Sequence, residues 1–209
     1  MYMKFFLQKK QYTKGFTLLE TLIAVTILVT ALVGPMTIAS NGLNSAFFAR
    51  DQVTAFYLAQ EGIEFVRYVR DTNTLRNQPL ADGDKKDWLF GLGVCTQDLT
   101  NVNDPEKKCE LDVRNSAPTN EPDNNRLNIA VIACSELAGC DPLKYDDPNT
   151  GSGMFQYATG NNSRFTREVS ITKLSGNPNQ ALVESTIHWS TGRISKDFTL
   201  KELITNWQQ

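Results

Sequence analysis

A single apolar run near the N-terminus constrains the fold of this chain more than any other feature. From Phe16 to Ala39 the sequence contains 24 residues, of which only Glu20 carries a formal charge. An α-helix of that length measures about 36 Å, and the hydrocarbon core of a bilayer is about 30 Å thick. We therefore expect residues 16–39 to form a helix that crosses a membrane.

The charges on either side of this run predict its orientation. Lys4, Lys9, Lys10 and Lys14 precede it without any acidic residue, and no basic residue follows it until Arg50. The positive-inside rule then leaves the N-terminus in the cytoplasm and places the remainder of the chain outside. Beyond the first fifteen residues the chain has 17 basic and 23 acidic side chains, a net charge of -6. We therefore expect no nucleic-acid partner.

Two positions are expected to interrupt the helix. Pro35, which follows Gly34, has no amide hydrogen and clashes with the carbonyl four residues earlier, so we expect a kink or a locally melted turn. Asn41-Gly42 is a second weak point. Over residues 40–71 an amphipathic continuation of the helix is expected, because apolar residues recur there at spacings of three and four. The predicted apolar face consists of Val53, Phe56, Ala59, Ile63 and Val66.

The rest of the chain divides into a loop-rich segment and a β-rich segment. Residues 72–126 are rich in Asn, Asp, Pro and Gly and indicate a variable loop region with short strands or turns. Residues 127–209 indicate about four antiparallel strands, with Leu127 to Cys134 as a buried central strand. Turn residues separate the later strands at Ser175 to Pro178 and at Ser190 to Gly192. Alternating apolar positions mark those strands at Phe165, Val169 and Ile171, at Val183, Ile187 and Trp189, and at Ile194, Phe198 and Leu200.

Four cysteines, Cys95, Cys109, Cys134 and Cys140, lie in two local pairs without any CxxC spacing. Disulfides fit this pattern and an extracytoplasmic location better than a zinc site does. Three connectivities are possible, and pairing of nearest neighbours would close loops of 15 and 7 residues. Buried free thiols are the alternative. The predicted fold is α+β, with a long helix packed on an antiparallel sheet and a disulfide-stapled loop region.

The junction between the lysines and the apolar run carries the most specific motif. It reads Lys14-Gly15-Phe16-Thr17-Leu18-Leu19-Glu20 and resembles the processing site of type IV prepilins and of the pseudopilins of type II secretion. The resemblance implies that prepilin peptidase, a membrane-embedded aspartic peptidase, cuts after Gly15 and N-methylates Phe16. Residues 1–15 would be the cleaved leader. Glycine suits the cut because it has no side chain to keep the backbone out of a protease cleft.

Glu20 is the second part of the motif. An ionisable group inside a spanning helix costs a few kcal/mol and is a functional hypothesis by default. The resemblance implies that this glutamate neutralises the N-terminal amine of a neighbouring subunit during filament assembly. The alternative is a hydrated glutamate near the membrane interface without a specific role.

A softer similarity favours one subtype. Ala59-Gln60-Glu61-Gly62-Ile63-Glu64, followed by Val66-Arg67, resembles the helix of minor pilins. The resemblance implies a type IV pilin-like fold and a structural subunit of a pilus or related envelope filament. The subunit would reside in the inner membrane, contact its lipid, and then reach the cell surface. Prepilin peptidase, other pilin subunits and an inner-membrane assembly platform would be its partners.

No catalytic constellation is evident in the sequence. The only histidine, His188, lies on the polar parity of a strand, so neither a Ser-His-Asp set nor a His-rich metal site can be assembled. Gly151-Ser152-Gly153 lacks the GK[ST] ending of a phosphate loop, and the aspartates lack the EF-hand spacing for calcium. We expect no cofactor, no metal and no enzymatic activity.

Three alternatives to the minor pilin remain. A pseudopilin of type II secretion would share the same processing motif. A signal-anchored extracytoplasmic binding domain would need only the basic start and the apolar span, and would keep Met1. A secreted enzyme cut by signal peptidase after about Ala39 would leave the membrane altogether.

Overall fold

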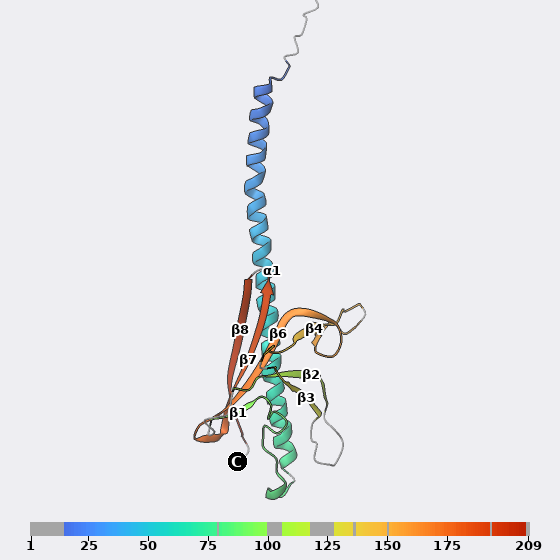
Figure 1. The fold of residues 1–209 in the computed structure, drawn as a ribbon, viewed down its shortest axis with the longest axis vertical. Coiled ribbons are helices and arrows are strands. Elements are labelled where there is room, and N and C mark those ends of the chain that lie inside the picture. Colours follow the sequence, from blue (N-terminus) through green and yellow to red (C-terminus); the bar gives the residue numbers. More distant parts are fainter. Residues whose placement is uncertain are drawn as a thin grey trace, which may run out of the picture. The chain divides into compact units, whose positions relative to one another are not determined.

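The computed structural model describes residues 15–78, 80–99, 106–117, 128–135, 137–149, 151–192 and 194–207. The chain divides into two compact units between Phe47 and Phe48. Helix α1, Leu18–Asn77, contributes to both units, and the second unit, which we call the head, also contains a β-sheet (Figure 1). The 3-10 helix η1, Asp82–Asp84, follows α1.

Three long strands form the largest part of the sheet. Strands β6 (Asn161–Leu174), β7 (Asn177–Thr191) and β8 (Ile194–Thr205) are connected in sequence order and pair antiparallel (Figure 1). The turns between them need a left-handed backbone, which glycine adopts without strain. Gly176 has φ +86° and Gly192 has φ +65°, so both predicted turns are confirmed.

Five shorter strands complete the sheet within the described residues. Strands β2 (Cys109–Ala117) and β4 (Pro142–Tyr145) pair antiparallel with β6. Strand β3 (Asn128–Ala133) pairs with β2, and β5 (Phe155–Gln156) pairs with β4. Strand β1 (Thr96–Asp98) pairs parallel with β6. The α+β architecture is therefore confirmed. Six of the eight described strands lie within residues 127–209, where about four were expected.

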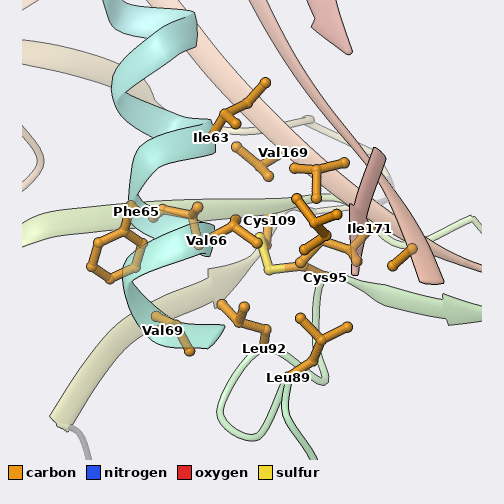
Figure 2. Packing of buried hydrophobic residues seen from close by; sticks show 14 of the residues in the cluster. Ile63, Phe65, Val66, Val69, Leu89, Leu92, Cys95, Cys109, Val169 and Ile171 are labelled. Carbon is orange, nitrogen blue, oxygen red and sulfur yellow. A yellow bond between two sulfur atoms is a disulfide. The ribbon is translucent and has the colours of Figure 1, made fainter. Parts of the chain in front are cut away.

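The main core of the head lies between the C-terminal half of α1 and the sheet. In Figure 2, Ile63 and Val66 of α1 point toward Val169 and Ile171 of β6. Burying such aliphatic side chains contributes roughly 1.5–3 kcal/mol each. A second cluster along the same helix joins residues of α1, β4, β6 and β7, namely Ala55, Leu58, Ala59, Leu143, Phe165, Ile187 and Trp189.

The buried face of α1 differs from the prediction. Ala59, Ile63 and Val66 are buried as expected, but Val53 is 55% exposed and Phe56 is 40% exposed. The helix turns a different edge of its apolar surface toward the sheet, because small residues let the backbones approach there. The buried positions of α1 are Asp51, Ala55, Leu58, Ala59, Gly62, Ile63, Phe65, Val66, Val69, Asn73 and Thr74. The helix also continues to Asn77, beyond the expected end at residue 71.

Two strand predictions also need correction. The apolar run that forms β3 was expected to be a buried central strand, but β3 pairs only with β2 among the described strands, and Ile132 is 58% exposed. Its apolar composition does not reveal that β3 lies at the edge of the described strands. On β8, Ile194 is 62% exposed, whereas Phe198 and Leu200 are partly buried. The predicted alternation on β6 and β7 is confirmed, because all six of its residues are buried.

Candidate functional site

The candidate site begins at the N-terminal end of α1. Gly15, Phe16 and Thr17 lie outside the helix and are exposed, and α1 starts at Leu18. The Thr17 carbonyl accepts a hydrogen bond from the Thr21 N–H at 3.1 Å, and its hydroxyl oxygen accepts one from the Glu20 N–H at 3.2 Å. These two bonds make Thr17 the N-cap residue. The bond between Gly15 and Phe16 therefore lies just outside the helix.

Glu20 lies in the first turn of α1, as the third helical residue. A carboxylate there interacts favourably with the partial positive charge of the helix N-terminus. None of the described residues forms an ion pair with it, and the residue is exposed among apolar neighbours. Its charge is thus available to a group from another molecule.

The apolar segment that follows is exposed on all sides in the isolated chain. Every residue from Gly15 to Arg50 is exposed, including Leu18, Leu22 and Met36. Among the described residues, α1 is the one helix long and apolar enough to cross a membrane. A helix that is apolar all round must be covered by lipid or by other helices. The segment is thus suited to a membrane or to a bundle of subunits.

The threonines in this segment keep their hydroxyl groups satisfied within the helix. Thr21, Thr26, Thr30 and Thr37 each donate to a backbone carbonyl three or four residues earlier, at 2.8–3.0 Å. This pattern removes most of the cost of placing a hydroxyl in an apolar environment. The threonines are therefore compatible with a helix that spans a membrane.

Of the kink or locally melted turn predicted at Gly34 and Pro35, the melted turn is not present in this structure. Pro35 lies inside α1, which is helical without interruption through Asn41-Gly42 as well. A proline removes one backbone hydrogen bond, and the adjacent turns keep theirs. Thr37 also donates to the Val33 carbonyl at 2.9 Å and so reinforces the helix around the proline. The expected locally melted turn is therefore wrong here.

The cysteines pair with their nearest neighbours in the sequence. Cys95 is bonded to Cys109 and Cys134 to Cys140. The first pair is fully buried in the main core, beside Val66 and Ile171 (Figure 2). Glu110 lies close to Cys134 and Cys140, but both sulfur atoms belong to a disulfide and are not thiolates for a metal.

A buried arginine that was not predicted from the sequence connects α1 to the sheet through hydrogen bonds. Arg167 of β6 is 2% exposed. Its guanidinium donates to the carbonyls of Leu58 and Leu111 at 3.2 and 2.6 Å and to the Glu61 carboxylate at 2.9 Å. Its own carbonyl accepts from the Tyr157 hydroxyl, and burial raises the pKa of Tyr157 to about 12. Arginine is seldom fully buried unless it is paired. The signal for its burial is its position between Phe165 and Val169, on the inward-facing parity of β6.

Gly62 provides the close approach between α1 and the sheet. A Cβ atom at this position would lie 2.7 Å from the Ser185 hydroxyl oxygen on β7. The sequence indicates Gly62 only as part of the Ala59 to Arg67 similarity. Thr17 is the other missed residue, and the pattern Thr-x-x-Glu before an apolar run is the signal that indicates such a cap.

Of the other predicted features, the polar position of His188 is confirmed, since its side chain is 47% exposed and lies 3.4 Å from Glu168. The leader lysines Lys4, Lys9, Lys10 and Lys14 lie outside the described residues.

Comparison with known proteins identifies the N-terminal segment. The family model described as the prokaryotic N-terminal methylation motif matches residues 10–34. This range includes Gly15, Phe16, Glu20 and most of the apolar run of residues 16–39. No curated protein and no solved structure matches the chain.

Proposed function

Since the chain carries the prokaryotic N-terminal methylation motif, which is the signature of type IV pilins and pseudopilins, we propose that it is a minor pilin, a structural subunit of a type IV pilus. The motif itself marks the chain as a pilin-like or pseudopilin-type substrate of prepilin peptidase. The choice of a minor pilin over a type II secretion pseudopilin is supported by the two-disulfide head and the Ala59 to Arg67 similarity.

The observation that carries the proposal is the position of the motif relative to the helix. Gly15 and Phe16 precede the capped start of α1, and the fully exposed apolar segment follows directly. We propose that the peptidase cuts between these two residues and methylates the freed amine of Phe16. An exposed segment outside regular structure is a favourable substrate for proteolysis.

Glu20 is proposed to select and align the neighbouring subunit. Its carboxylate stands on an otherwise apolar surface, where a charge without a partner costs a few kcal/mol. The N-terminal amine of an adjacent subunit would offset that cost at one register of the two helices only. The remaining apolar side chains would supply contact area without fixing the register.

The proposed route follows from the same segment. The leader lysines hold the N-terminus at the cytoplasmic face of the inner membrane, and the head lies outside, where both disulfides form. The inner-membrane assembly platform then moves the subunit out of the lipid and into the filament.

Substitution of Glu20 tests this role. Glu20→Leu should leave cleavage intact and abolish incorporation into filaments, because the amine of the neighbour loses its counter-charge. Thr21→Leu is the matched control, since it adds similar apolar bulk at the next residue without removing a charge. Sheared filaments are isolated and the subunit is quantified by immunoblot. Normal incorporation of the Glu20→Leu subunit would refute the role proposed for Glu20.

A further inference from the structure

The head contains a recess that the proposed assembly does not use. It is lined by residues of α1, β4, β5 and β6, and its volume is about 720 Å³. Volumes of about 300–1,000 Å³ are typical of small-molecule sites. The charged, aromatic and amide side chains that line it include Arg50, Asp51, Tyr145, Phe155, Asn162 and Arg164.

Arg164 is held in place by a buried carboxylate. Its Nη1 donates to Asp51 Oδ2 at 2.8 Å, and the same oxygen accepts from the Thr191 hydroxyl at 3.0 Å. The Asp51 side chain is only 3% exposed, whereas that of Arg164 is 43% exposed. The carboxylate therefore fixes one edge of the guanidinium and leaves the rest of it at the recess.

The guanidinium has donors to spare. An arginine carries five N–H donors in a rigid fork, and within the described part of the chain Arg164 has no acceptor other than Asp51. A fixed fork with unused donors matches a carboxylate, which accepts two parallel hydrogen bonds. Because the fork is already oriented, little side-chain entropy is lost on binding.

The local charge favours an anion. Arg50 also lines the recess, with its Nη2 at 3.7 Å from Asp51 Oδ1. The charged residues that line the recess are two arginines and one aspartate, a formal excess of one positive charge, although the whole chain has a formal charge of -2. An excess of charge of one sign in a concave site raises the local concentration of ligands of the other sign.

An aromatic pair and an amide form the rest of the recess. The rings of Tyr145 and Phe155 lie 5.1 Å apart, and Tyr145 is 39% exposed. Aromatic side chains with one wet end suit ligands that have an apolar face and polar edges. Asn162 is exposed, and its amide can both donate and accept hydrogen bonds. This combination fits a sugar ring with hydroxyl groups on its rim.

We propose that this recess binds a carboxylate-bearing sugar, such as a uronic acid residue of an acidic polysaccharide. The carboxylate pairs with Arg164, the sugar ring lies against Tyr145, and the hydroxyl groups bond to Asn162. The head would then recognise acidic glycans independently of the N-terminal segment, so failure of this proposal leaves the pilin assignment untouched.

Titration of the full chain with trigalacturonate tests the proposal. The protein is kept in a non-ionic detergent without sugar headgroups, and binding is followed by calorimetry. We expect saturable binding that is at least tenfold tighter than that of the neutral trisaccharide galactotriose. Absence of saturable binding, or equal binding of the neutral sugar, would overturn the proposal.

Three variants locate the site. Arg164→Lys keeps the ion pair with Asp51 but loses the fork, and Tyr145→Leu removes the aromatic face; each should weaken binding about tenfold or more. Arg76→Gln is the matched control, because Arg76 lies in the last turn of α1, about 39 Å along the helix from Arg50. Binding that Arg164→Lys and Tyr145→Leu leave unchanged would contradict the assignment, as would tighter binding of a glutamate-rich peptide than of the sugar acid.

Discussion

Removing the Cys95–Cys109 disulfide is expected to destabilise the head more than removing the Cys134–Cys140 disulfide. The first bond joins residues 14 positions apart, and the second joins residues 6 positions apart. On the chain-entropy account, closing loops of these lengths contributes about 3.0 and about 2.3 kcal/mol to the free energy of unfolding. Loop length alone therefore predicts a difference of about 0.7 kcal/mol.

Burial increases that difference. Cys95 and Cys109 are 0% exposed in the main core, whereas Cys134 and Cys140 are only partly buried. Replacing the first pair with alanine removes two buried sulfur atoms, each comparable to a methylene group and each contributing roughly 1 kcal/mol. The double variant Cys95→Ala/Cys109→Ala should thus lose about 5 kcal/mol, against about 2–3 kcal/mol for Cys134→Ala/Cys140→Ala.

Urea and thermal unfolding of the full chain in detergent measures both losses. For a head of this size, about 5 kcal/mol corresponds to a decrease in Tm of roughly 10–20 °C, and about 2–3 kcal/mol to roughly 4–12 °C. Thiol titration of the unfolded variants confirms that the remaining disulfide is intact. Equal decreases for the two double variants, with equal urea slopes, would refute the reasoning from loop length and burial.

Three further predictions concern the contact between α1 and the sheet. Gly62→Ala should lower the free energy of unfolding by about 1–3 kcal/mol, because the new Cβ atom would clash with the Ser185 hydroxyl. Ser185→Ala should relieve this clash without losing a hydrogen bond, since that hydroxyl has no partner among the described residues. Additive effects of the two substitutions in a double-mutant cycle would contradict this. Arg167→Met should lower the free energy of unfolding by about 2–4 kcal/mol, because the buried carbonyls of Leu58 and Leu111 lose their hydrogen-bond donor. An unchanged midpoint of urea unfolding would disprove this prediction. Because the pKa of Tyr157 is raised to about 12 and an unfolded tyrosine titrates near pH 10, the unfolded state loses its proton first. Stability should therefore fall by up to about 2.7 kcal/mol from pH 10 to pH 12. Tyr157→Phe should remove this decrease in stability between pH 10 and pH 12. The same dependence of stability on pH in the variant and in the original chain would contradict the prediction.

The elements that the sequence predicts well are those set by local chemistry. The long apolar run forms a helix, and the alternating residues of β6 and β7 face the core because a strand has a period of two. The turns at Gly176 and Gly192 follow from the left-handed backbone that glycine adopts. The motif at Gly15, Phe16 and Glu20 is likewise local, and it lies within the matched residues 10–34.

The features that were missed depend on contacts between distant segments. Val53 is as apolar as Ile63, yet Val53 is 55% exposed and Ile63 is buried, so composition alone does not tell which edge of α1 meets the sheet. Arg167 shares the inward-facing parity of Phe165 and Val169 on β6, but its partners Leu58, Glu61 and Leu111 come from distant segments of the chain. Pro35 remains inside the helix because the neighbouring turns keep their hydrogen bonds, a balance that residue type does not determine.

N-terminal sequencing and mass spectrometry of the mature subunit test whether prepilin peptidase processes this chain. We expect a chain that begins at N-methylated Phe16 and has lost residues 1–15. A mature chain that keeps Met1, or one that begins near residue 40, would contradict the assignment as a pilin-like substrate of prepilin peptidase.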